Sequence, residues 1–230
     1  MKLRTKLTKG DLRTHLLYFG WVYVLIAVLS FGLWNLIYAQ TAYRPPQDAR
    51  IDVYIQSSTA DQDAVNAFLE LIWKASVPEE ELVNAVLLMG AGGDNDYYAN
   101  IQLMTYIAAA EGDIYMLSSA DFKRLAAQGA FVALDEAIEQ GIIDAGDLSL
   151  NSGKVQLLES NDKGDLVPVG GMQQFGIPAR GLYRFATDLA IDNRDMVLAV
   201  AANSGNEEDT ITFLNALIQA TRAPIPDFFK

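Results

Sequence analysis

The stretch EGDIYMLSSADFKRLAAQGAFVALDEAI, residues 111–138, decides the fold of this chain. It begins with a short apolar run, 113–117, of the kind that lies inside a parallel sheet covered on both faces. Two serines follow, and the segment 120–128 then has the spacing of an amphipathic helix. Gly129 closes that helix at a position that favours left-handed backbone. A strand, a serine-bearing turn and a helix in this order are typical of an α/β sheet.

The same order occurs twice before this stretch. The segments 51–56 and 82–90 have the composition of strands. A helix between them places its apolar residues on one face, namely Val65, Phe68, Leu69, Ile72 and Trp73. A second helix is expected over 97–110, with an inward face made of Tyr97, Ile101, Met104 and Ala108. Three strand–helix pairs in a row predict a parallel sheet with right-handed crossovers.

Downstream the pattern weakens and then returns. The segment 141–171 is more polar, and NSGK and NDKGD within it are predicted turns. FGIPARG, 175–181, is expected to be a short extended element, and 195–203 a further strand. The segment 204–221 has a helical apolar face, formed by Ile211, Leu214, Leu217 and Ile218. The expected fold class is therefore α/β, with a parallel or mixed sheet flanked by helices.

The N-terminus carries a candidate membrane anchor. Residues 16–38 contain no charged side chain, and about 20 apolar residues suffice to span a bilayer. The basic tail 1–15 predicts that the N-terminus stays in the cytoplasm. A cleaved signal peptide is the alternative, but the apolar core of a signal peptide is shorter than residues 16–38, and no clear A-x-A cleavage site follows this segment. We expect a linker over 39–50, an extracytoplasmic domain over 51–220 and a tail over 221–230.

Composition excludes several classes of function. The chain of 230 residues has a net charge of −12, and an acidic body repels phosphate backbones, so we expect no nucleic-acid partner. It has no cysteine, and its one histidine, His15, precedes the apolar segment. A histidine-rich zinc site or a serine–histidine–aspartate triad is not expected. Asp94 and Asp96 offer too few oxygens for calcium. We expect no cofactor, no metal and no enzymatic activity.

Three segments resemble extracellular solute-binding proteins of ABC importers, in particular the carbohydrate-type family. AAEGDIYMLSSADFKRLAAQGAFVALDEAI, 109–138, is similar to a strand, turn and helix of that family. QQFGIPARG, 173–181, is similar to its YGIP strand near the hinge. DMVLAVAANSGNEEDTITFLNALI, 195–218, looks like its returning strand and helix. The resemblance implies a periplasmic-binding-protein-like fold and a non-enzymatic role beside an importer permease or another membrane protein, with a sugar as the implied ligand.

One departure from the family bears on function. Its members bind the solute in a cleft between two lobes, whereas the segment between FGIP and DMVLAV is too short for a domain of about 50 residues. The resemblance therefore implies a single lobe, serving as an accessory or receptor component. The alternative is an extracellular interaction or structural module with no small-molecule ligand.

Candidate ligand-binding residues follow from the topology. In open α/β sheets, ligands bind beyond the carboxyl ends of the strands. The polar residues at the ends of the first and third strands are Gln56, Ser57, Ser58, Ser118, Ser119 and Asp121. The competing interpretation is that the serines only cap helices, each contributing about 1 kcal/mol, with Ser58 or Thr59 capping the first helix of the domain. We expect capping to be their first role and ligand binding their second.

Overall fold

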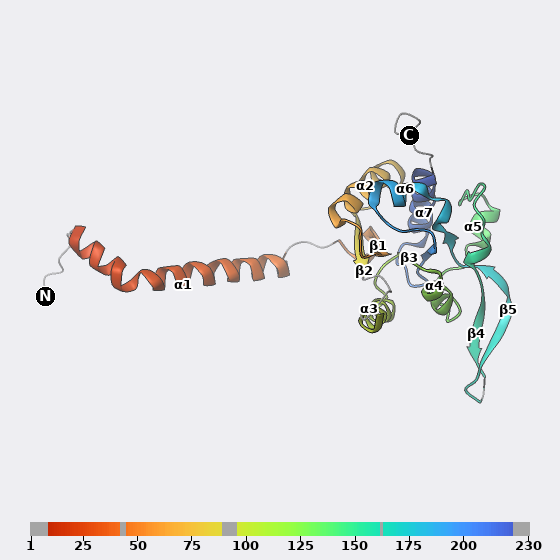
Figure 1. The fold of residues 1–230 in the computed structure, drawn as a ribbon, viewed down its shortest axis with the longest axis horizontal. Coiled ribbons are helices and arrows are strands. Elements are labelled where there is room, and N and C mark those ends of the chain that lie inside the picture. Colours follow the sequence, from red (N-terminus) through yellow and green to blue (C-terminus); the bar gives the residue numbers. More distant parts are fainter. Residues whose placement is uncertain (1–8, 42–44, 89–95, 162, 223–230) are drawn as a thin grey trace. The chain divides into compact units, whose positions relative to one another are not determined.

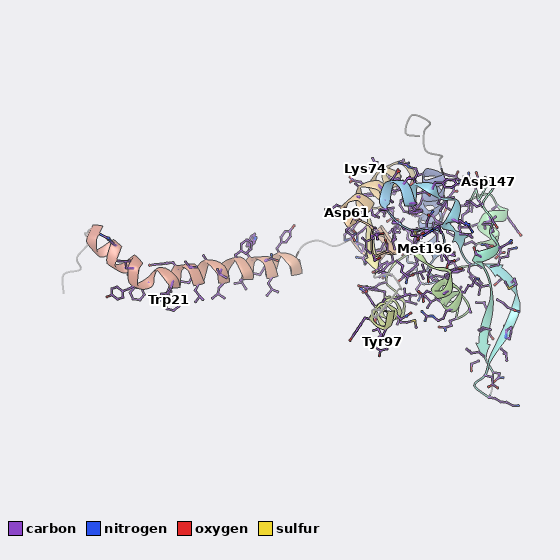
Figure 2. The ribbon with its side chains drawn as sticks, viewed as in Figure 1. Trp21, Asp61, Lys74, Tyr97, Asp147 and Met196 are labelled. Carbon is purple, nitrogen blue, oxygen red and sulfur yellow. The ribbon has the colours of Figure 1, made fainter. Side chains whose placement is uncertain are left out.

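The computed structural model of the chain describes residues 9–41, 45–88, 96–161 and 163–222. Its contacts divide the chain into two units, residues 1–44 and 45–230. The first unit contains helix α1 (Lys9–Thr41), which begins before the apolar segment and continues past it. The apolar part, Leu17–Tyr38, has a mean hydropathy of 1.9 and buries none of its residues. Trp21, for example, points away from the helix axis (Figure 2). By length and composition this helix can cross a membrane.

The second unit is built on a five-stranded mixed sheet with the order β2-β1-β3-β7-β6 (Figure 1). β1 runs parallel to β2 and β3, whereas β7 returns antiparallel between β3 and β6. This arrangement confirms the expected α/β class with a mixed sheet. The strands are β1 (Arg50–Gln56), β2 (Leu82–Leu88), β3 (Ile114–Ser118), β6 (Ile177–Pro178) and β7 (Met196–Val200).

Helices cover both faces of the sheet (Figure 1). One face packs against α2 (Gln62–Ser76), α5 (Asp135–Glu139), α6 (Tyr183–Leu189) and α7 (Glu207–Arg222). The other packs against α3 (Asp96–Ala108) and α4 (Ser119–Ala126). Because side chains alternate along a strand, β3 sends Ile114 and Met116 into the first core and Tyr115 and Leu117 into the second. β3 is thus buried on both faces, as its apolar sequence suggested.

The inward face predicted for α3 is wrong. Ala108 is exposed, and so are Tyr97, Ile101 and Met104, with exposed fractions of 71%, 46% and 39%. The side that faces the sheet carries Leu103, which is 3% exposed, and Tyr106. The ring of Tyr106 lies 4.9 Å from that of Tyr54 on β1. Aromatic packing on the sheet therefore selects this side of the helix over the predicted one.

A β-hairpin that the sequence did not predict occupies most of the polar segment 141–171. Strands β4 (Lys154–Ser160) and β5 (Leu166–Gln174) pair antiparallel and form a separate two-stranded sheet that projects from the unit (Figure 1). The predicted turn NDKGD is its tip, where the Asn161 carboxamide accepts from the backbone N–H of Lys163 and of Asp165. β5 is exposed along its length except at Gln174. NSGK provides the short 3₁₀ helix η2 (Asn151–Gly153) before the hairpin.

Candidate functional site

The strand order places a topological switch point between β1 and β3. From β1 the chain crosses to β2 on one side, and from β2 it returns past β1 to β3 on the other. The connecting helices α2 and α3 consequently lie on opposite faces, and the carboxyl ends of β1 and β3 are left facing an open crevice. An open hollow of about 690 Å³ lies there. It is lined by Gln56, Ser57, Ser58, Thr59, Ser118, Asp192, Arg194, Asp195 and Met196.

Gln56 and Ser118 are brought together at this edge by the pairing of β1 with β3. The side-chain oxygen of Gln56 accepts from the backbone N–H of Ser118 at 2.8 Å. Its amide nitrogen donates to Asp121 Oδ2 at 3.1 Å. The hydroxyl of Ser118 donates to the same carboxylate oxygen at 3.0 Å and accepts from the backbone N–H of Asp121, which makes Ser118 the N-cap of α4. These three side chains therefore satisfy one another.

Asp121 is buried and keeps its charge. Burial by itself would raise the pKa of its carboxyl, but hydrogen bonds from Arg124, Gln56 and Ser118 and the charge of Arg124 outweigh it, so the pKa lies below its usual value. The guanidinium of Arg124 donates to Asp121 Oδ1 at 2.9 Å. The carboxylate is thus committed to the turn between β3 and α4.

The hydroxyls after β1 are arranged differently. Ser57 Oγ accepts from the backbone N–H groups of Thr59 and Ala60, at 3.3 and 3.2 Å. Thr59 Oγ1 donates to the carbonyl of Ala190 at 2.6 Å. The predicted cap of α2 by Ser58 or Thr59 is wrong, because Asp61 accepts from the N–H of Ala64 and caps the helix instead. Ser58 is exposed at the mouth of the hollow.

Residues just before β7 form a wall that the sequence did not indicate. Arg194 holds Asp192 with two hydrogen bonds, Nε to Oδ1 at 2.8 Å and Nη2 to Oδ2 at 2.6 Å. Those bonds lower the pKa of Asp192 to about 2. The backbone N–H of Ser119 donates to the carbonyl of Asp195 at 2.9 Å. No motif marks these residues, because only the antiparallel return of β7 brings them to this edge.

A second open hollow, of about 1000 Å³, continues from the first along the same edge of the sheet. It shares Arg194, Asp195 and Met196 with the first hollow and adds Ser119 and Arg180. The predicted site residues are therefore divided. Gln56, Ser57, Ser58 and Ser118 line the first hollow and Ser119 lines the second, whereas Asp121 lines neither.

The chemistry that the edge can offer is hydrogen bonding. The hydroxyl groups and the Asp192–Arg194 pair can exchange hydrogen bonds with a polar, uncharged solute. In the ranges that the structure describes, no group of three or more histidine, cysteine, aspartate or glutamate side chains could hold a metal ion. Asp94, considered above for calcium, lies outside those ranges.

Comparison with known proteins finds similarity at the level of structure. The chain matches no protein-family model and no curated protein by sequence. Its structural neighbours include a family 1 extracellular solute-binding protein from Alicyclobacillus acidocaldarius, with 16% identity and a TM-score of 0.39 over 59% of this chain and 29% of that one. An ABC substrate-binding protein from Listeria monocytogenes, solved with cycloalternan, matches with 22% identity and a TM-score of 0.38 over 55% and 28%.

A third neighbour is the spermidine/putrescine ABC transporter substrate-binding protein from Streptococcus pneumoniae. It matches with 12% identity and a TM-score of 0.41 over 74% of this chain and 78% of that one. The aligned part of the chain thus spans less than a third of the length of the first two neighbours.

Proposed function

We propose that this chain is a membrane-anchored solute-binding-protein-like domain that binds a polar solute, such as a sugar, at the carboxyl edge of its sheet. Residues 16–38 are its single-pass anchor, with 1–15 in the cytoplasm, and the linker 39–50 leads to the extracytoplasmic domain 51–220. It serves an ABC-type uptake system as an accessory or receptor component. The observation that supports this most is the hydroxyl-lined hollow at the switch point between β1 and β3.

The hydrogen bonds within the edge limit which side chains can contact the solute. Gln56, Ser118 and Asp121 already satisfy one another, and disrupting them would cost their mutual hydrogen bonds. Ser58 at the mouth and the Asp192–Arg194 wall are the groups that remain open to a ligand. The connection from β6 to β7 contains only η3 (Ala179–Gly181), α6 and short loops, so it adds no opposing lobe. We therefore expect weak binding from one side.

Thermal unfolding of residues 45–230 against a panel of mono- and oligosaccharides tests the proposal. A solute that binds only the native state raises the melting temperature, and a hundredfold excess over Kd stabilises the fold by about 2.7 kcal/mol. We expect one class of sugar to raise the melting temperature of the wild-type protein. The variant Ser58→Ala should melt at the same temperature without sugar and show a smaller shift with it.

The control is Ser118→Ala, which removes the cap of α4. It should lower the melting temperature in the absence of sugar, since an N-cap contributes about 0.5–2 kcal/mol. If no sugar shifts a cooperatively folding wild-type protein, ligand binding at this edge is rejected.

The second candidate is an interaction module without a small-molecule ligand. The exposed strand β5 favours it, because Leu166 and Met172 are both 61% exposed on a projecting hairpin. If this candidate is right, crosslinking the full chain in its native membrane and isolating it should yield a partner protein crosslinked to β5. A partner lost on changing Leu166→Ser with Met172→Ser, together with no sugar shift, would favour this candidate.

A further inference from the structure

Helix α3 carries a second apolar stripe that faces away from the sheet. Tyr97, Ile101, Met104 and Ala108 follow one another at helical spacing on this side, and Thr105 lies beside them. With Asn100 they line a shallow hollow of about 520 Å³. Tyr97 points outward from the helix in Figure 2. Because its other stripe is already packed on the sheet, α3 has more apolar surface than the fold itself uses.

The stripe ends, at Ala108, close to the point where the anchor segment enters the domain. The side-chain amide of Gln47 donates to the carbonyl of Ala110, two residues past the end of α3, at 2.6 Å. The next residues lead directly into β1, and the carbonyl of Ala49 accepts from the N–H of Glu81. Residues 42–46, between the end of α1 and Gln47, can reach at most about 20 Å when fully extended. The helix itself is about 20 Å long.

Two basic residues of α4 lie near the stripe. The chain as a whole has a net charge of −12. Arg124 of α4 nevertheless lies against α3, with Nη2 3.0 Å from Asn100 Oδ1 and Nη1 3.5 Å from Met104 Sδ. Lys123, next to it, is exposed. Arg124 is also paired with Asp121, with Nη2 2.9 Å from Oδ1, so the attraction of this edge to an anionic lipid surface would come from Lys123.

We propose that the α3 stripe docks into the headgroup region of the same bilayer that α1 spans. The proposal rests on the membrane anchoring proposed above. Tyrosine suits the boundary between headgroups and acyl chains, since its ring is apolar and its hydroxyl is polar, and Ile101 and Met104 supply the apolar contact. The short tether keeps the bilayer at a high effective concentration, so even a weak contact is populated.

A second copy of the chain is the competing occupant. The exposed face of α3 measures about 20 by 10 Å, from the helix length and diameter. Stable protein interfaces bury about 800 Å² per partner, several times this area. The stripe alone is therefore too small for a stable dimer, whereas a tethered domain needs only a small contact to settle on lipid.

Nitroxide accessibility in vesicles tests the proposal, and a chain without native cysteine allows single labels. The full chain would be reconstituted in phosphatidylcholine with a minor fraction of phosphatidylglycerol, carrying one label at a time. Thr105→Cys reports on the stripe and leaves its apolar residues in place. Leu71→Cys, at a position 73% exposed on α2, is the matched control on the opposite helical layer. Leu29→Cys reports on insertion of α1.

We expect the label at 105 to be reached by oxygen dissolved in the bilayer and to lose most of its accessibility to a water-soluble nickel complex, relative to 71. Adding Tyr97→Ser and Ile101→Ser should restore nickel access at 105 without changing the melting temperature, because both side chains are exposed. If the label at position 29 lies in the bilayer while the label at 105 is as accessible to nickel as the control at 71, docking is rejected and the anchor stands. If the label at position 29 does not lie in the bilayer, both the anchor and the docking proposal fail. Shielding at 105 with spin–spin broadening that disappears on dilution with unlabelled chain would indicate a second copy and overturn the proposal.

Discussion

Asp121 joins two parts of the chain that lie far apart in sequence. Its carboxylate accepts from Ser118 within its own turn and from Gln56 at the end of β1. Arg124, one turn further along α4, completes its partners. Because the carboxylate is buried, its charge is maintained only by these donors. The turn between β3 and α4 therefore depends on one acidic side chain.

Replacing Asp121 with alanine should destabilise the domain by about 1–3 kcal/mol, since the buried amide of Gln56 loses its acceptor. Chemical unfolding at neutral pH measures this. The lowered pKa means that the stabilisation is present above the unfolded value near 4 and is lost as acid protonates the carboxyl. Asp188→Ala is the control, because Asp188 forms a more exposed helical pair with Arg184, worth about 0–1 kcal/mol. Equal losses in the two variants would contradict this account.

Helices α2 and α3 differ in how well the sequence predicts them. In α2 charged residues such as Glu70 and Lys74 mark the side that faces solvent. The sequence therefore shows where the apolar face lies, and that face is the one packed on the sheet. Residues 97–108 of α3 contain no charged side chain, so two of its faces are equally apolar and periodicity cannot choose between them. The hairpin β4–β5 escaped prediction for the opposite reason, because β5 is exposed and has no buried face to set a pattern.

The cap of α2 provides a test at the level of one element. Asp61→Ala should lower the free energy of unfolding by about 1 kcal/mol, because its carboxylate accepts from the first turn of the helix. Ser58→Ala should leave it within about 0.5 kcal/mol of wild type, as expected for an exposed residue without a structural role. Urea unfolding of both variants measures the difference. A larger loss in Ser58→Ala would restore the predicted serine cap.

The candidate site was predictable in part. Ser118 and Asp121 lie within one turn, and an ordinary capping pattern identifies them. Gln56 joins them because strand–helix alternation predicts that strand ends meet at one edge. The Asp192–Arg194 wall depends on β7 running antiparallel, and a five-residue apolar strand carries no signal of its direction.

At the scale of the whole molecule, the amino edge of the sheet collects buried carboxyl groups. The N–H of Asp52 donates to Asp113 Oδ2 at 2.8 Å, and the hydroxyl of Ser204 donates to Asp113 Oδ1. Glu80, before β2, accepts from the side chain of Asn206 at the start of α7. Burial raises the pKa of the carboxyl groups of Asp52, Asp113 and Glu80. For Glu80, burial together with nearby acidic groups brings the pKa to about 7. This edge therefore makes stability depend on pH.

Because the pKa of Glu80 is raised in the folded state, its protonated form stabilises the fold. This contribution is fully present below the unfolded pKa near 4.5 and is lost as the pH rises through about 7. Glu80→Gln removes the charge, so the variant should gain stability over wild type across this window. At pH 8 the gain should be on the order of 1–3 kcal/mol. Unfolding at a series of pH values measures it, with Glu79→Gln, at an exposed position, as the control. A difference that stays constant with pH would refute the assignment.

The route of the chain between β6 and β7 has a consequence for engineering. Ile177 lies opposite Leu198 in the sheet, so the chain leaves and re-enters at neighbouring positions. Within that excursion the side chain of Asn193 donates to the carbonyls of Ala179 and Leu182 and ties its two ends together. A fluorescent dye attached through Thr187→Cys, at an exposed position of α6 in a chain without native cysteine, would leave the strand pairing unchanged. The excursion is thus a place to build a reporter directly beside the crevice.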